Sequence, residues 1–273
     1  MIEMIAAFFS YTFLLRALTV GILVSLCAAL LGASLVLKNY AMIGDGLSHV
    51  GFGALAAATA LGWAPLAVAV PVVVAAAFLL LRLREASGIR GDSAVALVSV
   101  ASLALGVMIT SMSGSNTDLS GYLFGSILAL GRGDVILSVV LSAVVIILYV
   151  LFYNKIFAVT FDENFMRATG TRTGVYNSLL AALTAVTVVL GMRLTGALLI
   201  GGLIIFPALS AMSVCKKFRS VVTLSAVVSV ICYIAGLALS FTLDTPAGAS
   251  VVAVNVIVFA VFRASRMIRR THV

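Results

Sequence analysis

Nine runs of apolar residues, each close to the length of a membrane-spanning helix, follow one another along this chain of 273 residues. A helix needs about 20 predominantly apolar residues to cross the hydrocarbon core of a bilayer, which is about 30 Å thick. The runs cover residues 13–37, 41–61, 64–81, 93–112, 133–153, 175–192, 195–214, 221–241 and 247–262. The sequence therefore predicts an all-α fold, a polytopic helical bundle embedded in a membrane.

Composition excludes the other classes of protein. Hydrophobic residues make up 63% of the chain and charged residues only 10%, whereas a soluble domain is typically about a quarter charged. A soluble enzyme, a disordered chain, a coiled coil and a disulfide scaffold are thereby excluded. The sequence contains no glycine-rich loop ending in Gly-Lys-Ser or Gly-Lys-Thr. We therefore expect a single transmembrane domain over residues 1–273 that is not an enzyme and carries no P-loop ATPase of its own.

Two short connections leave the number of spans at eight or nine. Residues 62–65 and 191–195 separate neighbouring apolar runs so briefly that one broken or re-entrant segment could replace a clean span. Before the first run, residues 1–12 contain Phe8, Phe9 and Tyr11 and predict an interfacial helix at the membrane surface.

Charge predicts the orientation of the chain. Fourteen of the 17 lysines and arginines lie in connections on one side of the predicted membrane, and only Arg16, Arg132 and Arg193 lie on the other. Cytoplasmic loops are enriched in Lys and Arg, so with nine spans the C-terminus is expected inside and the N-terminus outside. The net charge of +8 follows from these loops and does not predict nucleic-acid binding.

The second apolar run contains an acidic residue and a histidine. If this span begins near Ala41, Asp45 and His49 lie about 6 Å and about 12 Å inside it. Their spacing places both on one helical face, and ionisable groups at such depth normally face a cavity, a partner or a pathway. A carboxylate and an imidazole together suit Zn, Mn or Fe as ligands.

A structural role for the same two residues is the alternative. Asp45 could be the N-cap of a helix that begins at Gly46, and His49 would then be an ordinary histidine in the first turns. The two interpretations are compatible, because transporters present binding sites on capped, broken helices.

A polar segment, residues 154–174, interrupts the pattern on the basic side. Its core predicts a short amphipathic helix, with an apolar stripe of Phe161, Phe165 and Ala168 and with charged side chains at Asp162, Glu163 and Arg167. A docking helix for a cytoplasmic partner and a solvated connector at the membrane surface both fit this pattern.

Two further interruptions lie near the C-terminus. Pro207 sits inside an apolar run, where it predicts a helix kink. Asp244 and Pro246 fall in the last hairpin, and Asp244 by itself is more typical of a helix cap than of a ligand.

Six stretches of this sequence, in the same order and over essentially its whole length, resemble the metal-ion permeases of ATP-binding-cassette importers, a family that serves zinc, manganese and iron. They are residues 35–49, 118–126, 161–170, 194–199, 206–209 and 244–248. The most specific is Gly-Asp-x-Leu-Ser-His, which here ends at His49. The chain departs from the family in Val50-Gly-Phe after this histidine and in Met166, where alanine is common.

The resemblance implies a vitamin- or metal-importer-type permease of the inner membrane that imports Zn²⁺, Mn²⁺ or Fe²⁺ and holds no permanent cofactor. It implies three partners: a cytoplasmic ATPase that binds ATP, an extracytoplasmic metal-binding protein, and a second permease, identical or different. In that family Asp45 and His49 would line the translocation path. The coupling helix gripped by the ATPase would include Phe161, Asp162, Glu163, Arg167, Ala168 and Gly170, and Pro207, Asp244 and Pro246 would lie at helix bends along the pore.

Three competing functions fit the sequence less well. A secondary transporter would usually contain more intramembrane acids than Asp45, and a siderophore-type permease would not need the Asp–His pair. An intramembrane aspartyl protease needs two facing aspartates that share a proton, and no second spanning helix supplies one. The sequence therefore favours an ATP-driven metal importer that works as a dimer around a two-fold axis.

Overall fold

The computed structural model describes residues 12–86, 91–113, 119–125 and 131–271, and within these ranges it contains helices and no strand. The nine predicted runs correspond to α2 (Thr12–Leu37), α3 (Ile43–Ala60), α4 (Pro65–Ala86), α5 (Gly91–Met112), α7 (Arg132–Leu151), α10 (Thr173–Thr195), α11 (Ile200–Val214), α12 (Phe218–Leu243) and α13 (Ala247–Thr271). Three shorter helices connect them: α6 (Leu119–Phe124), α8 (Tyr153–Phe161) and α9 (Glu163–Ala168).

The prediction of an all-helical membrane bundle is confirmed. Seven of the described helices are long and apolar enough to cross a membrane. The other two of the nine are α3, which carries Asp45 and His49, and α11, an apolar helix of only 15 residues. The predicted surface helix at the N-terminus lies outside the described residues, apart from Thr12, which begins α2.

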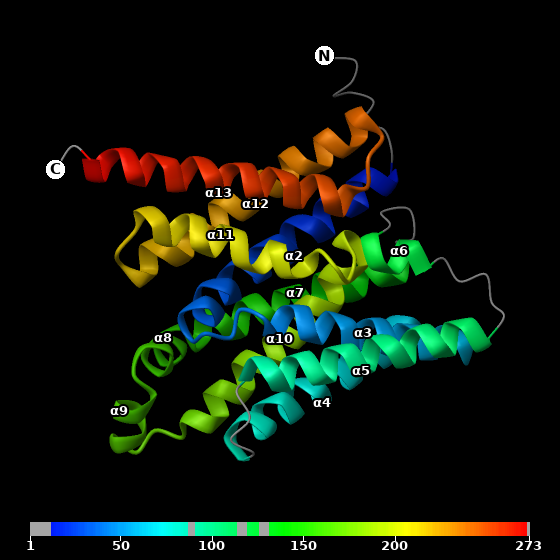
Figure 1. The fold of residues 1–273 in the computed structure, drawn as a ribbon, viewed down its shortest axis with the longest axis horizontal. Helices are drawn as coiled ribbons and strands as arrows, with labels where there is room; N and C mark the ends of the chain where they lie inside the picture. The colour runs from blue at the N-terminus through cyan, green and yellow to red at the C-terminus, as the bar shows by residue number, and fades with distance from the viewer. Residues whose placement is uncertain (1–11, 87–90, 114–118, 126–130, 272–273) are drawn as a thin grey trace.

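The helices run back and forth between two ends of the bundle. Figure 1 shows the ends of α2, α11 and α13 at the left, together with α8 and α9. The beginning of α2, the helix α6 and the turn between α12 and α13 lie at the opposite end. Lys38, Lys155 and Lys216 belong to connections at the left-hand end, so the basic residues collect at one end as the charge pattern predicts.

Glycines bring α3 unusually close to α5. A Cβ atom added to Gly53 would lie 2.8 Å from the carbonyl oxygen of Ser102, and one added to Gly46 would lie 2.5 Å from Cγ1 of Val95. On the other helix, a Cβ at Gly106 would lie 2.9 Å from the Cα of Gly53. Small residues permit such close packing where lipid supplies no hydrophobic drive between helices. The helix with the acidic residue and the histidine is therefore held firmly along its length.

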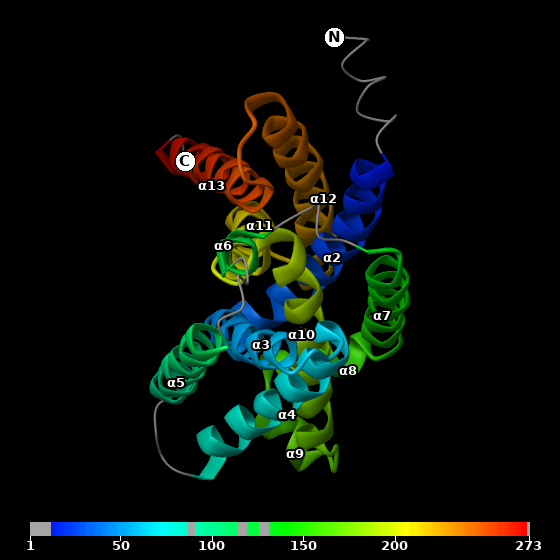
Figure 2. The ribbon, with the colours of Figure 1, turned by 90° about the vertical axis from the view of Figure 1, so that its right-hand side faces the viewer.

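The outer helices α5, α7 and α13 lie on two sides of the molecule. In Figure 2, α5 and α13 lie on one side, apart from each other, and α7 lies on the opposite side of α2 and α12. Both α5 and α13 present large apolar side chains outward; Leu97 and Val100 are 67% and 68% exposed, and Ile257 is 62% exposed. Such faces are compatible with lipid or with a second membrane subunit.

Candidate functional site

Asp45 and His49 face each other on α3. The imidazole Nε2 of His49 lies 3.8 Å from Oδ2 of Asp45, so the expectation that they share one helical face is confirmed. The His49 side chain is 11% exposed and that of Asp45 is 37% exposed. The histidine is therefore enclosed by the bundle, while the carboxylate remains open to approach.

The helix-cap alternative for Asp45 is not what the structure shows. Helix α3 begins at Ile43, three residues earlier than that alternative requires, and Met42 occupies the N-cap position without a capping side-chain bond. Asp45 is the third residue of the helix, near the positive end of its dipole. Its carboxylate is favourably placed there without being used as a cap.

The ring of His49 has an open hydrogen-bonding position. Its Nδ1 atom is buried and has no hydrogen-bond partner among the described residues, although most buried polar side-chain atoms in proteins have one. No group of three or more His, Cys, Asp or Glu side chains placed to hold a metal occurs in the described part of the chain. One chain thus offers two candidate ligands, and both have unused capacity.

A break between α10 and α11 lies directly against these residues. The two helices are separated by residues 196–199, and Gly196 has the positive φ of 87° that glycine adopts readily. The hydroxyl of Ser48 lies 2.6 Å from the carbonyl oxygens of both Asp45 and Ala197. The amide of Leu198 donates to the carbonyl oxygen of Leu123 on α6, at 3.2 Å. Residues 191–195 belong to α10, so the connection between the two predicted runs lies just beyond the position that the sequence indicated.

This break gives Ser48 and Gly201 roles that sequence reasoning missed. Ser48 ties the beginning of α3 to the non-helical backbone before α11. Gly201, the second residue of α11, lies beside the carboxylate: a Cβ there would be 3.6 Å from Cβ and 3.7 Å from Oδ1 of Asp45. Non-helical backbone within a membrane protein is tolerated where protein or a water-filled cavity surrounds it. In the sequence, Ser48 stands out as part of the Gly-Asp-x-Leu-Ser-His motif and Gly201 as part of a Gly-Gly pair. Neither pattern predicts the contact that the residue makes, with Ala197 and with Asp45 respectively.

The polar connector is built differently from its prediction. The predicted short helix is present as α9, but it does not include Phe161, because the backbone breaks at Asp162 between α8 and α9. Asp162 is the N-cap of α9 and accepts a hydrogen bond from the Phe165 amide at 2.9 Å. Ala168 is the last residue of α9, and Gly170, two residues later, has a φ of 81°. The segment is thus a sharply bounded helix of six residues.

The two phenylalanines of this connector, Phe161 and Phe165, are largely exposed, although Phe161 also contacts other aromatic rings. Phe161 packs against Phe157 and Phe218, with ring centroids 4.9 Å and 5.8 Å away. Even so, Phe161 and Phe165 are 59% and 62% exposed. An exposed apolar surface on a short polar helix is typical of a contact with another protein or with the membrane interface.

Glu163 is the centre of a polar network that joins three elements. It accepts hydrogen bonds from Lys38 at 3.4 Å, from Arg167 at 3.0 Å and from Asn177 at 3.1 Å. The Lys38 ammonium also donates to the side-chain oxygen of Asn177. Arg167 Nε donates to the hydroxyl of Thr173, at 3.1 Å. Helix α9 is thereby tied both to α10 and to the connection between α2 and α3.

Electrostatics favour the charged form of Glu163. Burial by itself raises the pKa of this carboxyl group, but the hydrogen bond from Asn177 and the charges of Lys38 and Arg167 outweigh burial and hold the pKa below its usual value. The Lys38 side chain is only 7% exposed, so this ion pair is partly shielded from solvent. The sequence did not predict the roles of Lys38 and Asn177. Their partner Glu163 lies 125 residues from Lys38 and 14 residues from Asn177.

The remaining predicted residues lie apart from this network. Pro207 is buried inside α11, which continues through it as one helix. Asp244 is the C-cap of α12 in the left-handed conformation, with a φ of 52°, in agreement with its interpretation as a cap. Pro246 immediately precedes α13. No described hydrogen bond or ion pair joins any of the three to Asp45 or His49.

Comparison with known proteins gives one consistent answer. A family model described as "ABC 3 transport family" matches residues 10–265. The chain is 34% identical over 250 residues to a probable metal transport system membrane protein of Thermotoga maritima, covering 91% of this chain and 88% of that protein. It is 31% identical over 252 residues to the manganese transport system membrane protein MntC of Halalkalibacterium halodurans, covering 92% and 86%. PsaBC from Streptococcus pneumoniae, solved in complex with Fab, superimposes with a TM-score of 0.86 at 28% identity, covering 96% of this chain and 95% of that chain.

Proposed function

The chain belongs to the ABC 3 transport family, and from that premise we propose that it imports divalent transition-metal ions, with manganese and zinc as the leading candidates. It is a membrane permease of an ABC importer and works with an ATP-binding subunit and a substrate-binding protein. The relatives named for manganese and metal transport support the substrate class.

The observation that carries the proposal is the pairing of Asp45 and His49. Their side chains lie 3.8 Å apart, beside a helix break, with a buried imidazole nitrogen that has no partner among the described residues. A divalent ion must exchange its hydration shell for such groups as it crosses. Asp45 supplies negative charge and His49 a neutral nitrogen, a combination suited to Mn²⁺, Zn²⁺ or Fe²⁺ and unsuited to Cu⁺, which prefers sulfur.

Two ligands per chain favour a paired permease. Tetrahedral and octahedral ions need four and six ligands. A second permease related by a two-fold axis would place its own acidic residue and histidine opposite Asp45 and His49. The exposed apolar side chains of α5 and α13, on the side away from α7 (Figure 2), offer a surface for that partner. Water would complete the shell and keep the ion weakly enough bound to be released.

Helix α9 is the proposed contact for the ATP-binding subunit. It lies at the end of the bundle where the basic connections collect (Figure 1), which we take as the cytoplasmic end together with the C-terminal end of α13. Exposed Phe161 and Phe165 would enter the partner's surface. Movement of α9 would pass through Glu163 to Lys38, seven residues before Asp45.

The competing functions have less support. A secondary transporter would work without an ATP-binding partner, whereas the family that matches this chain is a family of ABC transport proteins. A siderophore-type permease would carry a larger substrate, which does not call for the Asp45–His49 pair.

The function is tested by reconstituting the permease with its ATP-binding and metal-binding partners in vesicles. We expect uptake of manganese or zinc that requires ATP hydrolysis and is inhibited by the other divalent transition metals but not by Mg²⁺ or Ca²⁺. Uptake that follows an imposed proton gradient without ATP would instead support a secondary transporter.

A further inference from the structure

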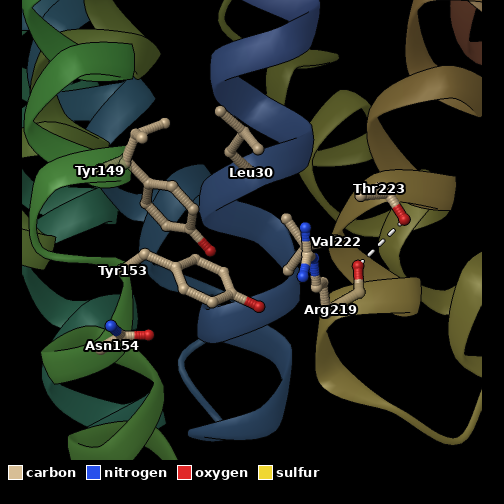
Figure 3. Close-up of a pocket in the computed structure, with 8 residues that line it drawn as sticks. Leu30, Tyr149, Tyr153, Asn154, Arg219, Val222 and Thr223 are labelled. Carbon is tan, nitrogen blue, oxygen red and sulfur yellow. Dashed lines mark hydrogen bonds between the residues drawn. The ribbon is translucent and has the colours of Figure 1, made fainter.

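A pocket of about 400 Å³, whose lining includes neither Asp45 nor His49, opens on the surface of the bundle. It lies between α2, the α7–α8 junction and α12 (Figure 3). Its walls are formed by Leu30, Tyr149, Val150, Tyr153, Asn154, Arg219, Val222 and Thr223. A volume of this size is in the range of small-molecule sites, about 300–1,000 Å³.

The pocket is polar at one end and apolar at the other. Arg219 is the second residue of α12 and Tyr153 is the first of α8, so both lie where spanning helices end. Val222 lies one turn deeper in α12, and Leu30 is seven residues inside the end of α2. This gradient follows the membrane normal, with polar groups at the interface and apolar groups toward the hydrocarbon core.

The charge of Arg219 is not neutralised within the described structure. Its side chain is exposed, and none of the ion pairs among the described residues includes it. Figure 3 shows its guanidinium group and the hydroxyl of Tyr153 directed toward each other across the pocket. Burial raises the pKa of Tyr153 and the Arg219 charge opposes that rise, in keeping with this proximity.

The pocket also opens beside an exposed apolar face of α7, which is available to lipid. Val150 on its rim is 63% exposed, as is expected of an outward-facing residue of α7. In Figure 2, α7 stands opposite α5 and α13, the helices proposed to meet a second permease. Lys216 and Lys217 precede Phe218, the first residue of α12, and lie at the same interface but outside the lining of the pocket.

We propose that this pocket binds an anionic phospholipid of the bilayer, with the phosphodiester on Arg219 and the acyl chains along the apolar wall. The planar guanidinium group matches a phosphate in bidentate geometry, and the hydroxyl of Tyr153 and the amide of Asn154 add neutral hydrogen bonds. Leu30, Val150 and Val222 form the wall along which the chains lie. The cytoplasmic leaflet is where anionic lipids collect, and basic pockets between helices on that side recognise their headgroups.

Native mass spectrometry of the permease–ATPase complex tests the proposal. The purified complex is washed with detergent containing phosphatidylcholine and phosphatidylglycerol in equal amounts. Wild-type complex is expected to retain phosphatidylglycerol, Arg219→Ala to retain it about fivefold less, and Arg219→Lys to be intermediate. Lys216→Ala removes the same charge from the same interface outside the pocket and is expected to match wild type. Equal loss in the two alanine variants, or equal retention of both lipids by wild type, overturns the proposal.

Two further arms separate a lipid from a free anion, and a specific site from general contact with lipid. Added inorganic phosphate is expected not to displace the lipid; displacement would show a site for a free anion instead.

The chain has a single tryptophan, Trp63, so a Trp63→Phe background with Val150→Trp places one fluorophore at the pocket. Brominated phosphatidylglycerol is expected to quench it more than brominated phosphatidylcholine. Ile136→Trp, at a 66% exposed residue near the other end of α7 and outside the pocket, is expected to show no preference, and a preference there would contradict a specific site.

Discussion

The Asp45–His49 pair and the Glu163 network are both built from a few ionisable side chains, but they satisfy those side chains in opposite ways. Glu163 accepts three hydrogen bonds from Lys38, Arg167 and Asn177. Asp45 and His49 are 3.8 Å apart, and a buried nitrogen of the histidine has no partner in the described part of the chain.

This difference in hydrogen bonding suits the two regions to different functions. A fully hydrogen-bonded network resists rearrangement, because breaking one member leaves a partly buried charge without compensation. A pair with open positions is costly to keep in a membrane and is retained where an ion or pathway uses it. Lys38 connects the two regions, since it contacts Glu163 and precedes Asp45 by seven residues. The first region is suited to transmitting movement and the second to passing an ion.

The largest expected effect is at the open pair. Asp45→Asn combined with His49→Ala is expected to lower manganese or zinc uptake by about 100-fold or more, because losing even a residue that only orients a metal ligand costs about 10–100-fold. Assembly with the ATPase should be unchanged. Uptake is measured in reconstituted vesicles at equal protein content.

Asp244→Asn is the matched control for that substitution. Asp244 is a C-cap with a left-handed backbone, a conformation that asparagine also tolerates, so uptake should stay near the wild-type level. Normal transport by the double variant, or its loss in Asp244→Asn, would show that the path has been assigned to the wrong acidic residue.

An intermediate effect is expected from narrowing the space beside the pair. The three heavy atoms nearest to a Cβ at Gly201 all belong to Asp45 and lie at ordinary contact distance, so Gly201→Ala should transport almost normally. The larger side chain of Gly201→Leu would press on the carboxylate and is expected to lower uptake about tenfold, since overpacking costs about 1–3 kcal/mol.

Gly133 is the control for a glycine-to-leucine change in a helix. A Cβ there meets no heavy atom within 4 Å, and Gly133→Leu should leave uptake unchanged. If Gly201→Leu transports as well as Gly133→Leu, the ion does not pass beside Asp45.

The smallest effect is expected in the satisfied network. Lys38→Met and Glu163→Gln should each lower metal uptake per ATP hydrolysed by about threefold, and the double variant should be no worse than either, because coupled groups are non-additive by about 0.5–3 kcal/mol. Simultaneous measurement of uptake and ATPase activity gives this ratio. Arg172→Gln, in the same segment but outside the network, should leave the ratio unchanged, whereas additive losses in the Lys38 and Glu163 variants would separate the two residues functionally.

The sequence by itself determined the fold class, the nine helical runs and the candidate pair. Apolar runs of spanning length have few alternatives, because lipid offers no partner for an unpaired backbone group. The spacing of Asp45 and His49 placed both on one face, and the structure agrees, because an i, i+4 relation holds in any α-helix. Asp244 as a helix cap was accessible for the same reason, since capping depends on neighbouring residues.

Only the tertiary structure decided which distant groups meet. Ser48 contacts Ala197, Gly201 adjoins Asp45 and Lys38 pairs with Glu163, although each pair is separated by more than a hundred residues. The break at Asp162, by contrast, is local, because this residue caps α9 by accepting from the Phe165 amide; it was missed because the apolar spacing of the connector also fits a continuous helix. The periodicity of apolar residues predicts each helix separately, whereas contacts between helices depend on how the whole bundle packs.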